Sequence, residues 1–526
     1  MKQTIYENGI ILTMNEEHPL AEAVLVEDDR ILAVGSREQV RQCCGIQCQV
    51  RDLQGKTLMP GFIDAHSHIR GFSNLLSTVL LQQAENFQDI QEKLRAKVKT
   101  LPAGEWLIGF GYDQNRLVEG THPTREILDQ VSEDHPILAV HQSGHMGAVN
   151  SMALKLMGIT AETPDPVGGK IGRKQDGTPN GYLEEAAFTL ASKYIPTPTG
   201  NQREEQLKQA EEIYLRYGIT TVQDGLTDPE GWSFLKKMAL DHQLSVDVVC
   251  YADLKNSKEL YRENRDYMTY QHHLKMGGYK LFLDGSPQGK TAWLTRPYEG
   301  SEDRGYPVYS DEQVTSFFEQ ALEDNAQILV HCNGDAAAQQ MISCYSRAKE
   351  KFPDRKIRPV MIHAQLVRPD QLEVMGKLGM IASFFVAHTY YWGDIHLKNL
   401  GQDRGNKISP VKSAINYGVP YTFHQDSPVL FPDMMKTVWC AVNRKTQSGK
   451  VLDQSQCLST WEALKGITIN SAYQYFEEDQ KGTIEPGKLA DFVLLDRNPL
   501  DTPKEELDQI QVLETIKQGN TVWKME

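Results

Sequence analysis

The chain has 526 residues, of which 40% are hydrophobic and 24% are charged, so it has a globular composition and is too long for one ordinary domain. Its formal net charge of -15 disfavours nucleic acid or an anionic membrane as a partner. It has no apolar run long enough to span a membrane and no secretory signal pattern, so we expect no membrane association. The eight cysteines form no Cys-x-x-Cys pair, which indicates a reduced, cytoplasmic protein without a zinc ribbon.

Both ends of the chain are rich in strand patterns. Near the start, residues 22–26 and 31–34 flank a short charged turn and predict a hairpin. Near the end, strand patterns cover residues 490–496, 512–516 and 521–523. We therefore predict one small β-domain that is assembled from residues 1–58 and 483–526.

The middle of the chain, residues 59–482, alternates apolar strands with amphipathic helices, which is typical of a parallel sheet. One strand, with the apolar lead-in Thr57-Leu58-Met59, is predicted just before His66. Seven more are predicted at residues 219–223, 246–251, 279–283, 328–330, 360–362, 381–386 and 421–423. Eight strands close a (β/α)8 barrel, so we predict an α/β fold of the TIM-barrel type.

A long segment, residues 70–205, interrupts this alternation after the first barrel strand. It contains its own strand pattern at residues 137–140 and several glycine-rich loops. Long loops on a rigid scaffold usually shape binding pockets, so we predict a large insertion at the catalytic mouth.

A His-x-His pair follows the first predicted barrel strand, in the stretch Pro60-Gly61-Phe62-Ile63-Asp64-Ala65-His66-Ser67-His68. Residues i and i+2 of a strand point to the same face, so His66 and His68 can offer two imidazole nitrogens to one metal ion. Histidines at this spacing often occur by chance. The pair gains weight because four more candidate ligands lie in or at the ends of later strands.

These four candidates are Lys280, His331, His363 and Asp426. Lys280 lies within a predicted strand, His331 and His363 each close one, and Asp426 follows the last one. Barrel active sites lie at the carboxyl ends of the strands, so we expect these side chains to meet the His-x-His pair there. Taken singly, either histidine would more simply be a core residue, and the aspartate could cap a turn.

Three or four imidazoles and a carboxylate suit a borderline metal such as zinc. Lys280 is the exception, because an ammonium group repels a cation. It could act as a ligand only after carbon dioxide converts its neutral amine into a carbamate, whose two oxygens could bridge two metal ions. The alternative is that Lys280 pairs with Asp284 or with a backbone carbonyl.

Several motifs together carry a family resemblance. They include Gly144-His145-Met146-Gly147-Ala148-Val149-Asn150-Ser151, Lys280-Leu281-Phe282-Leu283-Asp284-Gly285-Ser286, His331-Cys332-Asn333-Gly334-Asp335, His363-Ala364-Gln365, Gln425-Asp426-Ser427-Pro428-Val429 and the stretch 482–496. With the His-x-His stretch, they make the chain resemble the amidohydrolase superfamily, in amidohydrolase family 3, the branch that contains N-substituted formamide deformylase. The resemblance covers nearly the whole chain. The first motif together with the later ones is specific, whereas each later one alone is weak.

The resemblance implies a (β/α)8 barrel, a β-sandwich built from both chain ends, and hydrolysis by metal-activated water. Lys280 would be a carbamylated bridge, and Asp426 would be a metal ligand and proton shuttle. The remaining metal ligands would be His66, His68, His331 and His363. His145 is a substrate contact by resemblance, although it could equally be a surface histidine. Gln365 and His388 are further candidates for substrate binding because they lie near strand ends, and a structural role is about as plausible for both.

We therefore expect a metal-dependent hydrolase that acts on an amide or other non-peptide C–N bond of a small molecule. Two positions depart from the family pattern and bear on the substrate: Gln425, where relatives more often carry a small residue, and Ala387-His388, where a Pro followed closely by His is common. One alternative is a deaminase of the same superfamily, although such deaminases usually lack a lysine at the place of Lys280. The other is a non-catalytic metal-binding relative. One or two metal ions, and a monomer or a homodimer, all agree with the sequence.

Overall fold

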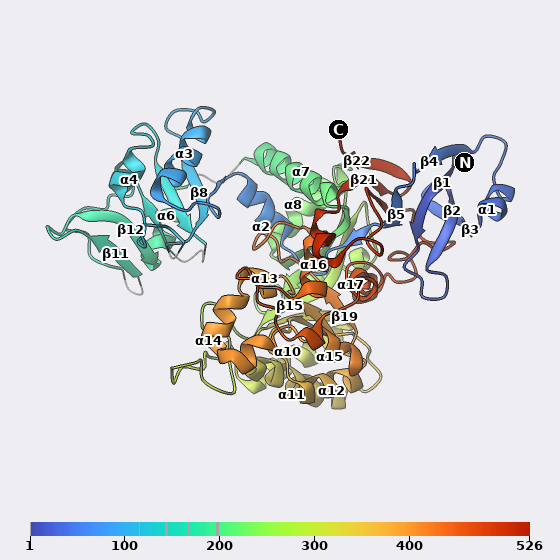
Figure 1. Cartoon of the computed structure of the whole chain (residues 1–526). Helices are drawn as coiled ribbons and strands as arrows, with labels where there is room; N and C mark the ends of the chain where they lie inside the picture. The colour runs from blue at the N-terminus through green and yellow to red at the C-terminus, as the bar shows by residue number, and fades with distance from the viewer. Residues whose placement is uncertain (1, 115, 143–145, 167–168, 196–198) are drawn as a thin grey trace. The chain divides into compact units, whose positions relative to one another are not determined.

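The computed structural model describes residues 2–114, 116–142, 146–166, 169–195 and 199–526 (Figure 1). The chain forms two compact units. The first combines Met1–Arg70 with Glu211–Glu526, and the second is Gly71–Ala210. Among the described residues, none of the helices combines the length and the apolar character that a membrane crossing requires.

Strands from both ends of the chain pair in one mixed sheet of the first unit. Its order is β22-β21-β20-β5-β1-β2-β3, with β4 paired to β1. The strands are β1 (Gln3–Leu12), β2 (Leu20–Glu27), β3 (Arg30–Gly35), β4 (Gln49–Asp52), β5 (Thr57–Pro60), β20 (Phe492–Leu495), β21 (Val512–Lys517) and β22 (Asn520–Lys524). The predicted hairpin is confirmed, since β2 and β3 are antiparallel neighbours. The two-layer sandwich remains a prediction.

Strand β5 joins the two chain ends, because it pairs in parallel with β1 and antiparallel with β20. Leu58 of β5 is fully buried in one apolar cluster with Tyr6, Ile11, Phe492 and Ile516, which come from both ends. The prediction that the lead-in Thr57-Leu58-Met59 belongs to the barrel strand is therefore wrong. This stretch completes the terminal sheet, and the two-residue strand β6 takes its place in the central sheet.

The central sheet of the first unit has eight parallel strands in the order β19-β18-β17-β16-β15-β14-β13-β6. They are β6 (Phe62–Ile63), β13 (Ile219–Thr227), β14 (Asp247–Asp253), β15 (Leu274–Phe282), β16 (Gln327–Cys332), β17 (Val360–His363), β18 (Ile381–Phe384) and β19 (Tyr421–Phe423). Strands β17, β18 and β19 are buried throughout, as parallel strands covered on both faces should be.

This sheet is curled, because its two outermost strands, β6 and β19, both form hydrogen bonds with the dipeptide Gly466-Ile467. Ile63 of β6 donates its N–H to Ile467 O at 2.9 Å, and Phe423 of β19 donates its N–H to Gly466 O at 2.9 Å. The carboxyl ends of the first and last strands are thereby brought together, and these are the strands that precede His66 and Asp426.

Helices connect the strands of the first unit. They are α1 (Arg37–Gln42), α8 (Pro229–Leu240), α9 (Lys258–Glu263), α10 (Asp311–Asp324), α11 (Asp335–Lys351), α12 (Pro369–Leu378), α13 (His388–Tyr391), α14 (Gly393–Asn406), α15 (Val411–Asn416), α16 (Met434–Asn443), α17 (Thr460–Lys465) and α18 (Ile469–Gln474). Three short 3-10 helices are η1 (Arg265–Met268), η2 (Gln454–Gln456) and η3 (Lys504–Gln509). Two helices cross the boundaries between the units, α2 (Ile69–Leu76) and α7 (Gly200–Arg216).

Local sequence explains where these helices begin and end. Ser310 and Gln313 form a capping box at the start of α10, and Asn325 ends that helix in the left-handed conformation. Helix α12 begins with Pro369 and is followed by Gly379 at φ 65°. Because these signals fix where each helix ends, they also fix where the following strand begins. The polar residues that follow the strands therefore lie at one edge of the sheet.

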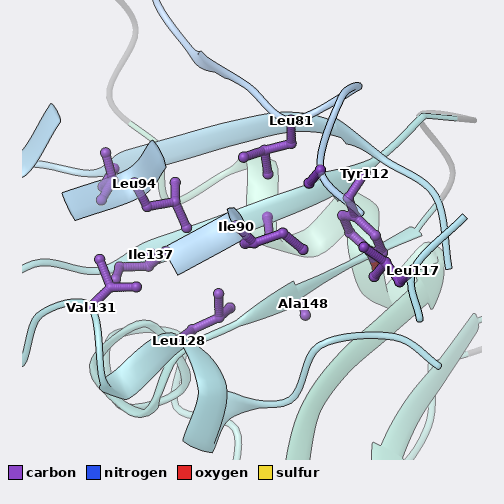
Figure 2. Packing of buried hydrophobic residues seen from close by; sticks show 12 residues of the cluster. Leu81, Ile90, Leu94, Tyr112, Leu117, Leu128, Val131, Ile137 and Ala148 are labelled. Atoms are coloured by element: carbon purple, nitrogen blue, oxygen red, sulfur yellow. The ribbon is translucent and has the colours of Figure 1, made fainter. Parts of the chain in front are cut away.

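The second unit has a six-stranded sheet of its own, in the order β11-β12-β10-β9-β8-β7. Its strands are β7 (Val79–Leu80), β8 (Leu107–Tyr112), β9 (Ile137–His141), β10 (Met146–Val149), β11 (Gly169–Arg173) and β12 (Pro179–Glu185). Its helices are α3 (Phe87–Val98), α4 (Arg125–Asp129), α5 (Ser151–Leu156) and α6 (Ala186–Ser192). Figure 2 shows its apolar core, in which Ile90 and Leu94 of α3 lie close to Ile137 of β9 and Leu128 of α4.

Candidate metal centre

The six predicted metal ligands all belong to the first unit and lie in or after strands of the central sheet. His66 and His68 follow β6, and Asp426 follows β19. Lys280, His331 and His363 lie within β15, β16 and β17. Because all eight strands are parallel, the curl of the sheet brings their carboxyl ends to one rim.

His66, His68 and Asp426 form the tightest group. Their ligand atoms all lie within 4.8 Å of one another. Asp426 Oδ1 is 3.5 Å from His66 Nε2 and 3.4 Å from His68 Nε2. The backbone holds the group together, because Asp426 N donates to His66 O at 3.2 Å and His68 N donates to Ser427 O at 2.8 Å.

His331 and His363 lie next to this group. His363 Nε2 is 3.0 Å from His331 Nδ1 and 3.8 Å from Asp426 Oδ2. The ring centroids of His66 and His363 are 6.0 Å apart. Four imidazoles and one carboxylate that are far apart in the sequence therefore share one neighbourhood.

Lys280 is buried beside these residues, with Nζ 3.3 Å from His66 Nε2. Burial lowers the pKa of Lys280 to about 8, so a far larger fraction of its amine is neutral near pH 7 than in an exposed lysine. Pairing with Asp284 is not found within the described residues. That carboxylate instead accepts backbone N–H groups from Trp293 at 3.0 Å, Asn333 at 2.9 Å and Gly334 at 2.7 Å.

The protonation states suit a cation. Burial lowers the pKa of His331 to about 4, and it lowers those of His66 and His363 well below their usual range. Burial alone would raise the pKa of Asp426, but the adjacent His68, His66 and His363 hold it well below its usual range. His66, His331 and His363 therefore present neutral imidazoles, each with a lone pair that a metal could use, near one ionised carboxylate.

His66 is oriented by a glutamine that the sequence prediction missed. Gln223 Oε1 accepts from His66 Nδ1 at 2.6 Å, and the Gln223 amide nitrogen donates to Ala65 O at 3.1 Å and to the Tyr475 hydroxyl at 3.0 Å. These contacts place the His66 proton on Nδ1 and leave Nε2 for a ligand. Gly225 makes room for the ring, since a Cβ there would lie 2.7 Å from His66 Cε1.

The other histidines are oriented in the same way. His331 Nε2 donates to Gly285 O at 3.1 Å, which leaves Nδ1 facing His363. His363 Nδ1 is 3.2 Å from His424 Nε2, and His424 Nδ1 is 2.9 Å from Ser383 Oγ. His424 was also missed, although it precedes Asp426 by two residues in the same strand-end segment. Each supporting contact fixes a ring from behind, as outer-shell partners of metal ligands do.

The predicted substrate contacts differ in what the structure describes. His145 lies outside the described residues. Gln365 follows β17 and is fully buried, and its Nε2 has no hydrogen-bond partner in the described part of the chain. His388 begins α13 after β18, and its ring contacts Phe385, which in turn contacts His424. Gln365 and His388 thus lie at the same rim of the sheet as the metal ligands, and their contact with substrate remains a prediction.

Gln425, the departure from the family pattern, has a structural partner. Its amide nitrogen donates to Asp433 O at 2.7 Å and also contacts Thr437 Oγ1. The side chain therefore bonds to the first turn of α16.

The family model described as "Amidohydrolase family" matches residues 49–523, and a short match to "Imidazolonepropionase-like composite domain, bacteria" covers residues 23–43. YtcJ of Bacillus subtilis (strain 168) is 28% identical, over 99% of each chain. The N-substituted formamide deformylase of Arthrobacter pascens is 28% identical, over 99% of this chain and 98% of the deformylase. An uncharacterized metal-dependent hydrolase from Pyrococcus horikoshii OT3 has a solved structure with a TM-score of 0.78 at 25% identity, covering 96% of this chain and 99% of that chain. The chain therefore belongs to the amidohydrolase family and is related to metal-dependent hydrolases.

Proposed function

We propose that the protein cleaves an amide or another non-peptide C–N bond of a small molecule with the help of a bound metal. The observation that carries this proposal is the position of Asp426 Oδ1, a buried carboxylate oxygen. It lies beside the Nε2 atoms of His66 and His68 and forms no hydrogen bond with any residue that the structure describes. A buried carboxylate oxygen without a hydrogen bond is costly, so the arrangement favours a cation beside it. The name of the Arthrobacter pascens relative, a deformylase of substituted formamides, agrees with a C–N bond as the target.

The donor set fits a zinc ion, because zinc accepts imidazole nitrogen and carboxylate oxygen ligands together. The proposed ligands are His66, His68, His331, His363 and Asp426. Lys280 could join them if its neutral amine adds carbon dioxide and releases a proton, which yields a carbamate able to bridge a second ion. When bound, the metal lowers the pKa of water towards ~7 and polarises the substrate carbonyl.

Asp426 is the proposed proton shuttle. It is ionised at neutral pH, so it can accept the proton that the attacking water loses. The carboxyl group then passes this proton to the nitrogen of the departing amine, which leaves as a neutral molecule. The Nε2 atoms of His66 and His68 lie within 3.5 Å of Asp426 Oδ1, so the carboxylate is next to the proposed metal ligands.

The remaining parts of the assignment follow from this function. We infer that Gln365, His388 and His145 contact the substrate, and that the curled central sheet is a (β/α)8 barrel. Residues 1–58 and 483–526 would form its composite β-sandwich, and residues 70–205 would be an insertion. A cytoplasmic location belongs to the same proposal.

The test combines metal analysis with turnover. Protein purified in the presence of zinc is expected to hold one or two divalent ions per chain and to hydrolyse members of a panel of N-formyl and N-acyl amines. Chelation should abolish this activity and added zinc should restore it. Release of ammonia without amide cleavage would instead identify a deaminase. A fully loaded protein that neither cleaves a compound of the panel nor releases ammonia would identify a binding protein.

A further inference from the structure

Two buried histidines, His388 and His396, form a pair beside the candidate metal centre. His388 is the first residue of α13, and His396 lies in the first turn of α14. The two residues are 4% and 0% exposed. His388 Nδ1 and His396 Nε2 are 3.1 Å apart, which is a hydrogen-bond distance.

The two rings lie nearly in one plane, since their planes differ by 7° and their centroids are 5.3 Å apart. Together with the short N···N distance, this is the geometry of an in-plane N–H···N hydrogen bond. The backbone fixes the spacing, because Trp392 N donates to His388 O at 3.1 Å and His396 N donates to Trp392 O at 2.8 Å. Gly393 packs tightly there, as a Cβ would lie 2.6 Å from Thr446 Cγ2.

His388 is the member of the pair that lies near the metal ligands. The Phe385 ring contacts His388 with centroids 4.6 Å apart, and it also contacts His424 at 5.3 Å and His363 at 6.1 Å. The Asp426 charge acts on the His388 imidazole. Nε2, the second ring nitrogen of His388, makes no hydrogen bond within the described part of the chain. It is therefore available to a ligand.

The protonation of the pair follows from burial. Burial lowers the pKa of His396 to about 3 and that of His388 well below its usual range, so both rings are neutral. One N–H therefore lies between them and belongs to one of the two rings. If it belonged to His388, the proton of the other ring would sit on His396 Nδ1, a buried atom that has no hydrogen-bond partner among the residues placed by the structure. A buried N–H without an acceptor is rare and costly, so the shared proton belongs to His396 Nε2.

We propose that His396 is a positioning residue, whose Nε2–H donates to His388 Nδ1 and fixes His388 as the tautomer with its proton on Nε2. His388 then presents a neutral N–H donor that would bind the carbonyl oxygen of the scissile bond, a role that rests on the proposed hydrolase function. A fixed donor stabilises the developing oxyanion more than the ground-state carbonyl. The pair therefore acts on kcat rather than on KM.

The kinetic test compares two substitutions of His396. His396→Leu removes the donor and keeps the site apolar, and it is expected to lower kcat about 10–100-fold with KM within about twofold. His396→Gln places an amide N–H at a similar reach and should recover most of the loss. His135→Leu removes another buried histidine, 4% exposed, and serves as the control with unchanged kcat.

Zinc content and Tm are measured on every variant, so that a folding or loading defect is recognised. Wild-type kcat in His396→Leu would overturn the proposal. So would a His396→Gln variant that is as slow as His396→Leu at equal zinc content and Tm, because the N–H would then be irrelevant.

A spectroscopic test does not depend on turnover. In protein labelled with nitrogen-15 histidine, the two tautomers of a neutral imidazole give different ring correlation patterns, and His388→Asn identifies the signals of His388. We expect the Nε2–H tautomer in the wild type and a mixture in His396→Leu. The Nδ1–H tautomer at His388 in the wild type would overturn the proposal even in an active hydrolase. If no panel compound is cleaved, the proposed function fails, while this spectrum still decides the tautomer.

Discussion

Charged side chains are buried at both ends of the central sheet, but the groups that surround them differ between the two ends. At the amino end, Asp247 accepts from Lys517 at 2.7 Å and contacts Lys481, while Lys517 also pairs with Asp491 at 2.7 Å. At the carboxyl end, Asp426 Oδ1 forms no hydrogen bond with the residues that the structure describes, and it faces the imidazoles of His66 and His68. A buried charge that pairs with an opposite charge of the chain is costly to deprive of its partner, whereas a buried carboxylate oxygen without a hydrogen bond points to a ligand.

A cavity that is lined by charged residues need not be a ligand-binding site. A cavity of about 820 Å³ opens at the amino end of the sheet, with Asp247, Lys275 and Glu477 in its lining. Lys275 pairs with Glu477 at 2.7 Å, and Lys481 pairs with the same carboxylate at 2.9 Å. Each of these charges already faces an opposite charge.

Four predictions test whether the two ends differ as described.

The largest effect is expected from Asp426→Asn at the carboxyl end. The change removes the ionised oxygen but keeps the shape of the side chain, so kcat/KM should fall about 10²–10⁴-fold because the proton shuttle is lost. The four histidines should still retain metal. Steady-state kinetics and metal analysis of the same sample check this prediction, and near-wild-type rates would remove Asp426 from the mechanism.

At the amino end, Asp247→Asn should damage stability instead of turnover. Lys481 and Lys517 would each lose a buried partner, and breaking such a pair costs about 3 kcal/mol of unfolding free energy. Urea denaturation measures the loss, and kcat of the folded enzyme should not change. Glu373→Gln breaks an exposed pair with Lys377 and is the control, with an effect of about 0.5 kcal/mol or less. A loss in Asp247→Asn as small as that of the control would contradict the assignment.

Gln223→Leu should weaken the metal centre without removing a ligand. Without its hydrogen bond, His66 is free to rotate, and the loss of such a supporting contact typically lowers metal affinity about 10–100-fold. Competition with a chromophoric chelator measures the affinity. Gln243→Leu, at an exposed glutamine, is the control, and equal affinities in the two variants would argue against the supporting role.

The smallest effect is a pH dependence of stability. Burial alone would raise the pKa of Asp247, but Lys481 and Lys517 hold it well below the usual 3.8. A pKa that is lower in the folded state stabilises the fold fully above pH 3.8, and this contribution is lost as the pH falls through the folded-state pKa. The stability difference between wild type and Asp247→Asn should therefore shrink as the pH falls below 3.8. A difference that grows in acid would contradict the paired network.

Much of the centre was predictable because strand periodicity is local. The apolar runs predicted seven of the eight strands of the central sheet, and the polar residues that interrupt or follow the strands are the ones that meet at its rim. The family resemblance is confirmed by the match over residues 49–523. Gln223 and His424 were not predicted, because a buried polar residue in a strand pattern does not reveal which atom it will contact.

The boundary between the sheets could not be predicted for a related reason. Thr57–Pro60 and Phe62–Ile63 are both short apolar strands, and only Gly61 separates them. Their assignment to different sheets depends on partners far along the chain, Phe492 for Pro60 and Ile219 for Phe62.

The sequence by itself determined the alternation of strands and helices, the His-x-His pair, and the residue types that a metal could use, because these depend on local pattern and side-chain chemistry. Only the tertiary structure decided that Asp426 lies between imidazoles while Asp247 lies between lysines. Both are aspartates at the ends of apolar strands, and their roles differ because the curl and the register of the sheet give them different neighbours. The free energy of a buried charge depends on those neighbours, and the chain brings them from segments hundreds of residues away.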